Sequence, residues 1–121
     1  MLSVLFLVML SATEEKPLPP AGARTKVGQK ITVEMTVRSA KERLEKRGEI
    51  YLDSEADFRD EKNFAVVITR SGVASLKGAS ITDPVAHFKD KKVRVRGTVK
   101  EVERVPRIEI DDASQVRIVE K

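Results

Sequence analysis

The stretch that decides the fold is residues 92–100, which read KVRVRGTVK. Val93, Val95 and Val99 alternate with basic and polar residues, which is the period-two pattern of a strand with one face in the core. Gly97 interrupts the alternation where such a strand bends sharply around a small barrel. These residues predict a long, half-buried strand in the second half of the chain.

A second alternating stretch lies upstream, at residues 31–37, and predicts another half-buried strand. Its apolar members are Ile31, Val33, Met35 and Val37. The next residues, 39–47, read SAKERLEKR and offer only Leu44 for burial. They predict a long exposed loop, with at most one helical turn.

Two further strands are predicted at residues 49–54 and 64–69. In the first, Ile50 and Leu52 share one face and Tyr51 lies on the other, because successive side chains of a strand point to opposite faces. The second is continuously apolar, and its expected inward residues are Phe64, Val66 and Ile68. Both strands supply aliphatic residues to one core.

The β pattern stops at residues 71–91, where helical turns are expected around residues 73–77 and 84–88. Asp83 is a natural cap for the second turn, since Pro84 follows at the first helical position. Further along, residues 104–107 predict a hairpin turn with Pro106 at its edge. Short strands at residues 108–110 and 116–119 complete the pattern.

The order of three strands, a helical connector and two or three further strands is typical of a five- to six-stranded Greek-key β-barrel. The 121 residues have room for one domain, and 40% hydrophobic with 35% charged residues is an ordinary globular balance. Only 4% of the residues are aromatic, so the barrel interior must be mainly aliphatic. The expected fold is a small, closed, mainly β barrel.

Five blocks of sequence, in this order, carry a family resemblance. They are GEIYLD from Gly48, NFAVVI from Asn63, KVRVRG from Lys92, PRIEI from Pro106 and ASQV from Ala113. Together they resemble bacterial OB-fold domains, both the accessory domains of exported nucleases and small stand-alone nucleic-acid-binding OB proteins. The resemblance covers about residues 27–119 and implies an OB-fold with a nucleic-acid connection. It implies no nuclease activity, because the catalytic domain has no counterpart here.

The N-terminal residues predict an export signal. Residues 2–10 are almost unbroken apolar and end in the small residues Ser11 and Ala12, which resembles a signal peptide spanning residues 1–12. The run is far shorter than the ~20 residues of a membrane-spanning helix. No Lys or Arg precedes it, and Leu10 stands where a small residue is usual, so a cytoplasmic chain is the alternative. Residues 13–26 are proline-rich and predict a linker that carries no core, which leaves residues 27–121 as the domain.

The charge is mildly basic, +4 for the chain and +3 for residues 27–121, which hold 20 basic and 17 acidic residues. On the strand at residues 92–100, Arg94 and Arg96 share one outward face and are spaced to contact successive phosphates of a nucleic-acid strand. The alternative is a solvated strand face, with these arginines paired across the sheet with Glu109 or Glu34.

Tyr51 is the outward aromatic candidate for stacking on a base, because base-binding OB-folds commonly use their second and third strands as a platform. Phe58, Phe64 and Phe88 are expected to pack in the core or in turns. With Arg70 and Lys77 as auxiliary cations, the predicted nucleic-acid-binding residues are Tyr51, Arg70, Lys77, Arg94 and Arg96.

Nothing in the sequence predicts catalysis, a cofactor or a metal site. There is no cysteine, His87 is the single histidine, and no glycine-rich phosphate loop or nucleophile elbow is present. Residues 53–57 begin like a calcium-binding loop, but Phe58 and Phe64 stand where that loop needs Gly and a bidentate Glu. The chain is therefore predicted to be a binding module and not an enzyme.

The first functional interpretation is an exported OB-fold module that binds single-stranded nucleic acid or a similar polyanion weakly and with strong salt dependence. The alternative is an envelope-associated module that presents its barrel face or residues 39–47 to a protein partner. A third interpretation, an accessory to a separately encoded nuclease, depends on the family resemblance. The oligomeric state stays open.

Overall fold

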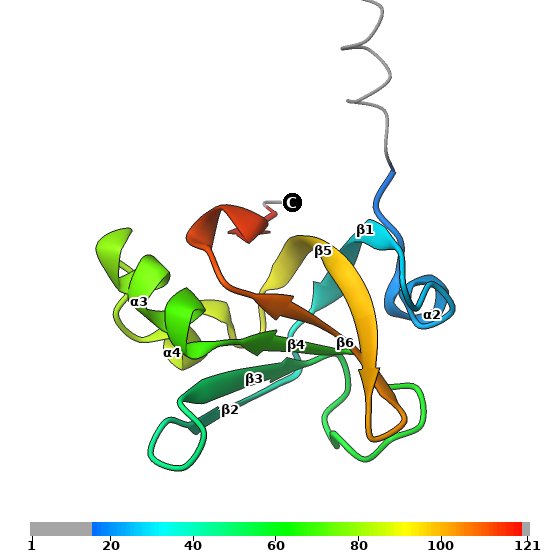
Figure 1. Cartoon of the computed structure of the whole chain (residues 1–121), viewed down its shortest axis with the longest axis horizontal. Coiled ribbons are helices and arrows are strands. Elements are labelled where there is room, and N and C mark those ends of the chain that lie inside the picture. The colour runs from blue at the N-terminus through cyan, green and yellow to red at the C-terminus, as the bar shows by residue number, and fades with distance from the viewer. Residues whose placement is uncertain (1–15, 120–121) are drawn as a thin grey trace, which may run out of the picture.

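The computed structural model describes residues 16–119, which form one seven-stranded sheet with short helices beside it (Figure 1). The predicted signal peptide, residues 1–12, lies outside the described residues. The strands are β1 (Lys30–Thr36), β2 (Ser39–Arg43), β3 (Glu49–Asp53), β4 (Ala65–Ile68), β5 (Lys92–Val102), β6 (Val105–Ile110) and β7 (Val116–Ile118). The helices are α2 (Pro20–Ala23), α3 (Arg70–Gly78), α4 (Pro84–Phe88) and the short 3-10 helix η1 (Ala113–Gln115).

The strands follow the order β1-β5-β6-β4-β3-β2, and β7 pairs with the first residues of β5 on the side opposite β1. β4 and β6 run parallel, and every other named pair is antiparallel. Between residues 16 and 119 no ladder joins β1 to β2, so the sheet is not closed. The predicted closed barrel of five or six strands is therefore wrong in both closure and strand number.

The two ends of this strand order are nevertheless consecutive in the chain, because the backbone changes partners at residues 37–38. The amide of Val37 donates to the carbonyl of Lys91 at 2.9 Å, next to β5, whereas the amide of Arg38 donates to the carbonyl of Asp53 at 2.9 Å, in β3. One bent segment thus forms both β1 and β2. The sheet is therefore curved, as the sequence predicts, but no ladder of hydrogen bonds between β1 and β2 closes it into a barrel.

The core follows the alternation of the sequence. β5 buries its valines while Arg94 and Arg96 point away from the core, and β1 alternates in the same way. The buried residues of these two strands are Ile31, Val33, Met35, Val93, Val95 and Val99. Each such side chain contributes about 1.5–3 kcal/mol when it leaves water. The sheet is held mainly by this aliphatic interior, to which Phe64 and Phe88 add fully buried rings.

Residues 39–43 form strand β2, so the prediction of an exposed loop there is wrong. β2 pairs antiparallel with β3, from Ser39 opposite Asp53 to Arg43 opposite Glu49. Only Ala40 of β2 packs against the core, and Leu44 is 36% exposed. A strand with a single small apolar residue shows no repeated alternation of apolar and polar residues, which explains why the sequence pattern missed it.

The β5–β6 hairpin turns earlier than predicted. Val102 pairs with Val105, so Glu103 and Arg104 form a two-residue turn, with φ values of 51° and 70°. Positive φ at both positions is typical of the type I′ turn, which matches the twist of the flanking strands. Pro106 lies inside β6, just before the ladder to β4 begins at Arg107, so its missing N–H group costs no bond to β4.

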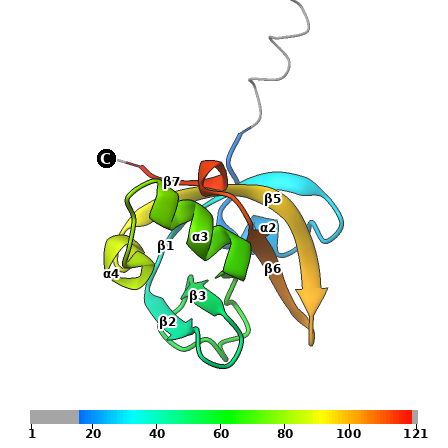
Figure 2. The same ribbon diagram turned by 60° about the vertical axis from the view of Figure 1, so that its left-hand side comes forward.

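The helical connector lies where the sequence predicts it. α4 has Pro84 at its first turn, and the Asp83 carboxylate caps it by accepting from the amide of Ala86 at 3.2 Å. α3 packs against β3, β4 and η1, in front of the sheet in Figure 2. A Cβ atom at Gly72 would lie 2.1 Å from the carbonyl oxygen of Ile110, so glycine permits this close approach. The connector therefore covers one side of the sheet.

The proline-rich stretch before β1 contributes more than a tether. Leu18 bridges to Val33, and its amide donates to the carbonyl of Thr32 at 2.8 Å. Ala23, in α2, is fully buried and belongs to the core. Residues 13–26 were expected to contribute nothing to the core. From Leu18 onward this expectation is wrong, because Leu18 and Ala23 pack against or within the core. Among residues 16–119, no helix is long and apolar enough to cross a membrane.

Candidate nucleic-acid interface

A hollow of about 390 Å³ lies over β2, β3, β4 and β6, beside the β5–β6 hairpin. We call it the Tyr51 hollow. Its lining residues are Ser39, Lys41, Arg43, Arg47, Tyr51, Asp53, Phe58, Asn63, Ala65, Val102, Glu103, Val105 and Arg107. The volume lies within the ~300–1,000 Å³ range of small-ligand sites in proteins.

Strand register explains which side chains meet in this hollow. Ser39 pairs with Asp53, Asp53 with Ala65, and Ala65 with Arg107, so these four residues form one row across β2, β3, β4 and β6. Residues two positions along a strand share its face, which places Lys41 and Tyr51 in the next row. Ala65 is the smallest side chain of its row, so the floor is lowest between Asp53 and Arg107.

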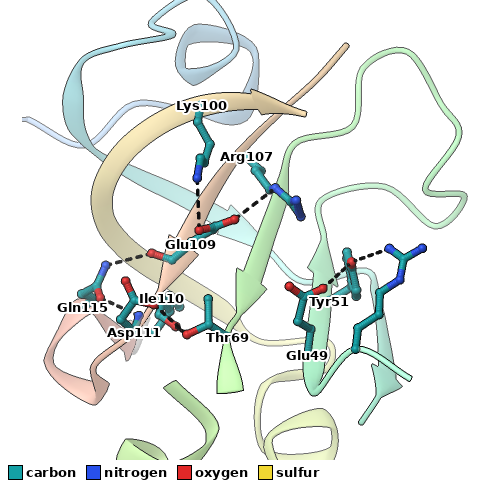
Figure 3. A network of polar contacts seen from close by, with 10 residues as sticks. Glu49, Tyr51, Thr69, Lys100, Arg107, Glu109, Ile110, Asp111 and Gln115 are labelled. Atoms are coloured by element: carbon teal, nitrogen blue, oxygen red, sulfur yellow. Dashed lines mark hydrogen bonds and ion pairs between the residues drawn. The ribbon is translucent and has the colours of Figure 1, made fainter. Parts of the chain in front are cut away.

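Tyr51 stands half-buried in the hollow with its hydroxyl held from two sides (Figure 3). It donates to Glu49 Oε1 at 2.7 Å and accepts from Arg47 Nη1 at 3.2 Å. The hydrogen bond with Tyr51 raises the pKa of Arg47 above its ordinary value, so this guanidinium is always charged. The ring is thereby fixed beside a permanent cation.

Phe58 is the second aromatic side chain of the hollow, and it is 55% exposed. The guanidinium carbon of Arg59 lies 5.8 Å from the centre of its ring. The expectation of core or turn packing is confirmed for the buried Phe64 and Phe88, whereas Phe58 lies outside the core. The hollow thus offers two rings, Tyr51 and Phe58, where the sequence predicts one.

Basic side chains outnumber acidic ones in the lining. Lys41, Arg43 and Arg47 are exposed at its rim, on β2 and the turn that follows. The acidic members are Asp53 and Glu103. An extended polyanion that crosses the rim meets three cations in succession, each of which can neutralise a phosphate.

Asp53 is buried, with 4% exposure, at the floor of the hollow. Asn63 Nδ2 donates to its Oδ1 at 2.9 Å, and Asn63 is itself buried beneath the acidic turn. Burial raises the pKa of Asp53 above its ordinary value, against the smaller opposing effects of the Asn63 bond and the charge of Lys41. This carboxylate is therefore poorly solvated.

Arg107 forms the other side of the floor, and its side chain is 14% exposed. Its Nε lies 3.6 Å from Glu109 Oε2, while Lys100 Nζ approaches Glu109 Oε1 at 3.3 Å (Figure 3). Among residues 16–119, Nε of Arg107 has no hydrogen-bond partner. A buried donor left in this state loses free energy relative to its hydrated form.

Arg94 and Arg96 lie elsewhere, in a hollow of about 260 Å³ that shares no lining residue with the Tyr51 hollow. We call it the Arg94 hollow. It is lined by Pro17, Thr32, Arg94, Arg96, Ser114, Gln115, Val116 and Arg117. Arg94 Nε pairs with Glu34 Oε1 at 2.7 Å, and Arg96 Nη1 donates to Thr32 Oγ1 at 3.3 Å. The cross-strand pairing of Arg94 with Glu34 is the alternative that the sequence allows.

Arg70 and Lys77 lie on α3, outside both hollows. The Arg70 guanidinium packs against Gly48, where a Cβ atom would lie 2.6 Å from Arg70 Cζ. The five predicted binding residues therefore do not gather in one place: Tyr51 is in one hollow, Arg94 and Arg96 are in another, and two cations are on a helix.

Sequence reasoning missed the basic rim of the Tyr51 hollow because it assigned residues 39–47 to a loop. The available signal is the alternation of Lys41 and Arg43 with Ala40 and Glu42, which is the period-two pattern of a strand with one basic face. No comparable signal identifies Arg107 or Asp53, whose roles depend on pairing between strands distant in sequence. Within residues 16–119 no three His, Cys, Asp or Glu side chains gather as a metal site.

No protein-family model matches the sequence, and no curated protein sequence matches it. Two aspartyl-tRNA synthetases are among the solved structures that are similar in fold. One is a putative aspartyl-tRNA synthetase from Leishmania major Friedlin, with a TM-score of 0.58 and 10% identity over 90% of this chain and 21% of that one. The fold is OB-like. The other is the aspartyl-tRNA synthetase from Entamoeba histolytica, with a TM-score of 0.56 and 12% identity over 91% of this chain and 22% of that one. This OB-like chain thus spans about a fifth of the length of each.

Proposed function

We propose that this OB-like domain binds single-stranded nucleic acid in the Tyr51 hollow. The observation that carries the proposal is the presence of two accessible rings, Tyr51 and Phe58, in one hollow with a rim of three exposed cations. Proteins that bind single strands combine stacking rings with a basic groove, because rings hold bases of any sequence and cations neutralise the backbone. The Tyr51 hollow has both parts.

The expected binding is modest and salt-sensitive. Three rim cations, Lys41, Arg43 and Arg47, neutralise about three phosphates, and the logarithm of the affinity then falls by about 0.7 per phosphate for each tenfold rise in salt. Two rings add about 1–3 kcal/mol per stacked base. The mild net charge of +4 agrees with a local basic rim on an otherwise balanced surface.

The two similar structures support a nucleic-acid partner only in a general way, since their names describe enzymes that act on tRNA. We propose no such enzymatic activity for this chain, and we interpret it as a non-catalytic binding module. A relation to the accessory domains of exported nucleases rests on the five sequence blocks that suggest it, and is part of the same proposal.

The test is a fluorescence-anisotropy titration of a labelled oligo-dT of about ten nucleotides at ~50 mM and ~200 mM salt. The test protein, called the hollow variant, is a triple variant that combines Lys41→Ala, Arg43→Ala and Arg47→Ala. The matched control is Lys77→Ala, Lys89→Ala, Lys91→Ala, which removes the same charge from exposed positions outside the hollow. The double variant Arg94→Ala, Arg96→Ala tests the face that the sequence predicts.

Loss of about tenfold or more in affinity for the hollow variant, with less than about threefold for the other two, supports the proposal. Equal losses for the hollow variant and the matched control mean that binding follows net charge and not this site. No binding by the wild type at low salt eliminates the proposal. In that case, recovery of a stoichiometric protein partner by pull-down favours the interaction module as the function.

Export is a separate part of the proposal and has its own test. If the apolar residues before Thr13 are a signal peptide, N-terminal sequencing of the mature protein from its native cell begins near Thr13. Retention of Met1 in a normal cytoplasmic pool contradicts export and leaves the binding proposal intact.

A further inference from the structure

The floor of the Tyr51 hollow carries two polar groups that the protein itself leaves incompletely paired. Asp53 and Arg107 flank Ala65 in one row of the sheet. The Asp53 carboxylate accepts from Asn63 through Oδ1, and Arg107 Nε has no hydrogen-bond partner among residues 16–119, with only the longer ion pair to Glu109 Oε2 at 3.6 Å. Within the same residues, no hydrogen bond or ion pair joins Asp53 to Arg107. A carboxylate and a guanidinium thus line the same hollow on the two sides of Ala65.

The separation of these groups suits a ligand between them. Asp53 and Arg107 are two strands apart, and neighbouring strands lie about 4.8 Å from each other, so their backbones are about 10 Å apart. Ala65, between them, leaves the space above it open to the hollow. A ligand that donates toward Asp53 and accepts from Arg107 adds hydrogen bonds to both groups, whose loss of hydration is compensated only in part by Asn63 and Glu109.

The floor disfavours a phosphate and favours a neutral ring. A phosphate above Ala65 is repelled by the Asp53 carboxylate, since two negative charges at close range in a poorly solvated site are unfavourable. The exposed rim cations are the better place for phosphates. A base edge, in contrast, presents donors and acceptors side by side, and its ring lies within reach of Tyr51 and Phe58, which line the same hollow.

Guanine is the base whose edges match this pair at both ends. Its N1–H and amino group donate toward a carboxylate, and its O6 and N7 are the acceptors that arginine contacts most often. Adenine and cytosine each have one amino donor on the edge that would face Asp53, so each makes one hydrogen bond to the carboxylate where guanine can make two. A base that fills only one side of the floor leaves a buried group unpaired.

We propose that the floor of the Tyr51 hollow is a guanine-selective base pocket, in which Asp53 accepts from the base and Arg107 donates to it. The inference rests on the proposed function, since it assigns a preferred base to the same hollow. Asp53 and Arg107 act as specificity residues, while the rim cations supply most of the affinity. The domain therefore binds many single strands and prefers those that contain an accessible guanine.

The experiment compares four labelled pentanucleotides, dT-dT-dX-dT-dT, in which X is G, A, C or T. Anisotropy titrations run at about pH 8, because burial raises the pKa of Asp53 and a higher pH favours its ionised form. The wild type is expected to bind the guanine pentamer about tenfold more tightly than the other three, the discrimination typical of a bidentate contact.

Two shape-preserving variants test the residues. Asp53→Asn keeps the acceptor for Asn63 but removes the charge, and Arg107→Lys keeps the charge but removes the planar fork of donors. Each is expected to reduce the guanine preference to within about twofold, with the affinity for the all-thymine pentamer kept within about threefold. Glu103→Gln is the matched control, because Glu103 is an acid of the same hollow outside the floor, and it keeps the preference.

The outcomes separate this inference from the proposed function. Equal, salt-sensitive binding of all four pentamers by the wild type overturns guanine selectivity and leaves nucleic-acid binding in place. Binding of none of them overturns both. A guanine preference that persists in Asp53→Asn and Arg107→Lys overturns the assigned residues. If Asp53→Asn does not fold, the guanine preference of Arg107→Lys alone tests the assigned residues. This variant is expected to fold, because lysine keeps a positive charge beside Glu109 at this position.

Discussion

The two hollows of this domain differ in how their charges are satisfied. In the Arg94 hollow, Arg94 contacts Glu34 at 2.7 Å, and Lys92 approaches the other oxygen of the same carboxylate at 3.7 Å. In the Tyr51 hollow, Asp53 is buried without a cationic partner in contact, and Arg107 Nε has no hydrogen bond within the described residues and lies 3.6 Å from Glu109 Oε2. The more basic strand in the sequence is thus the better neutralised surface, so the number of arginines on a strand is a poor guide to a binding site.

Register explains this difference. Glu34 lies directly opposite Arg94 in the β1–β5 ladder, where opposite charges attract across neighbouring strands. An incoming phosphate has to compete with that carboxylate. The row through Asp53, Ala65 and Arg107 instead separates its two charged residues by an alanine, so they do not neutralise each other directly across neighbouring strands.

The largest expected effect concerns stability beneath the Tyr51 hollow. Asn63 is 2% exposed, donates to Asp53, and accepts from the Glu55 amide at 3.0 Å. Asn63→Ala removes these bonds and leaves a buried carboxylate alone, so the free energy of unfolding should fall by about 2–4 kcal/mol.

Urea unfolding measures this loss against a control from the other hollow. Thr32→Val removes a hydroxyl that accepts from Arg96 at a partly exposed site, and should change stability by less than about 0.5 kcal/mol. Similar losses for the two variants would contradict the claim that the polar groups beneath the hollows differ in burial and pairing.

The second effect concerns binding. Tyr51→Ala removes a ring from one hollow, and its loss should weaken oligo-dT binding by about 1–3 kcal/mol, the usual value of one stacked base. Tyr51→Phe keeps the ring and should retain most of the affinity. Arg94→Ala should have less effect than Tyr51→Ala in the same anisotropy titration. If Tyr51→Phe loses as much as Tyr51→Ala, the hydroxyl and its bond to Arg47 matter more than stacking.

Much of the fold follows from local pattern. The strands β1 and β5 were predictable because each has one apolar and one polar face, and α4 was predictable from Asp83 and Pro84. β2 was not predictable, because Ala40 is its only apolar residue and its strand conformation depends on pairing with β3. Local pattern thus identifies elements that bury residues and misses those that only pair.

The candidate site was less predictable than the fold, for the same reason. Tyr51 was found because outward aromatic residues on a strand are rare in this chain. The floor of the Tyr51 hollow was not predictable. Asp53 and Arg107 are 54 positions apart in the sequence, and only the parallel pairing of β4 with β6 places them in one row of the sheet. Phe58 was expected to pack in the core or in a turn; it lies in the turn after β3, exposed, and lines the hollow.

The third effect is a pair of opposite pH dependences. The hydrogen bond with Arg94 lowers the pKa of Glu34 below 4.5, so its contribution to stability is present above that value and is lost as the pH falls through the lowered pKa. Burial raises the pKa of Asp53 above 3.8, so its contribution is present below that value and is lost as the pH rises through the raised pKa.

Urea unfolding of Glu34→Gln and Asp53→Asn across acidic and neutral pH tests both signs. Relative to the wild type, Glu34→Gln should be less stable at neutral pH, with the difference shrinking in acid. Asp53→Asn should gain stability relative to the wild type as the pH rises. Dependences of the same sign in both variants would mean that the two carboxylates have similar surroundings, contrary to the structure.

The smallest effect separates the hollows by salt alone. Lys41 is exposed at the rim of the Tyr51 hollow, and if it neutralises one phosphate, Lys41→Ala should reduce the slope of log Kd against log salt by about 0.7. Lys92→Ala removes an equal charge next to Glu34 on the other surface and should leave the slope unchanged. Titrations of oligo-dT at four or more salt concentrations measure both slopes. An equal reduction in both variants would mean that the nucleic acid responds to the charge of the whole domain, because only a site-specific contact releases counterions at one lysine and not at the other.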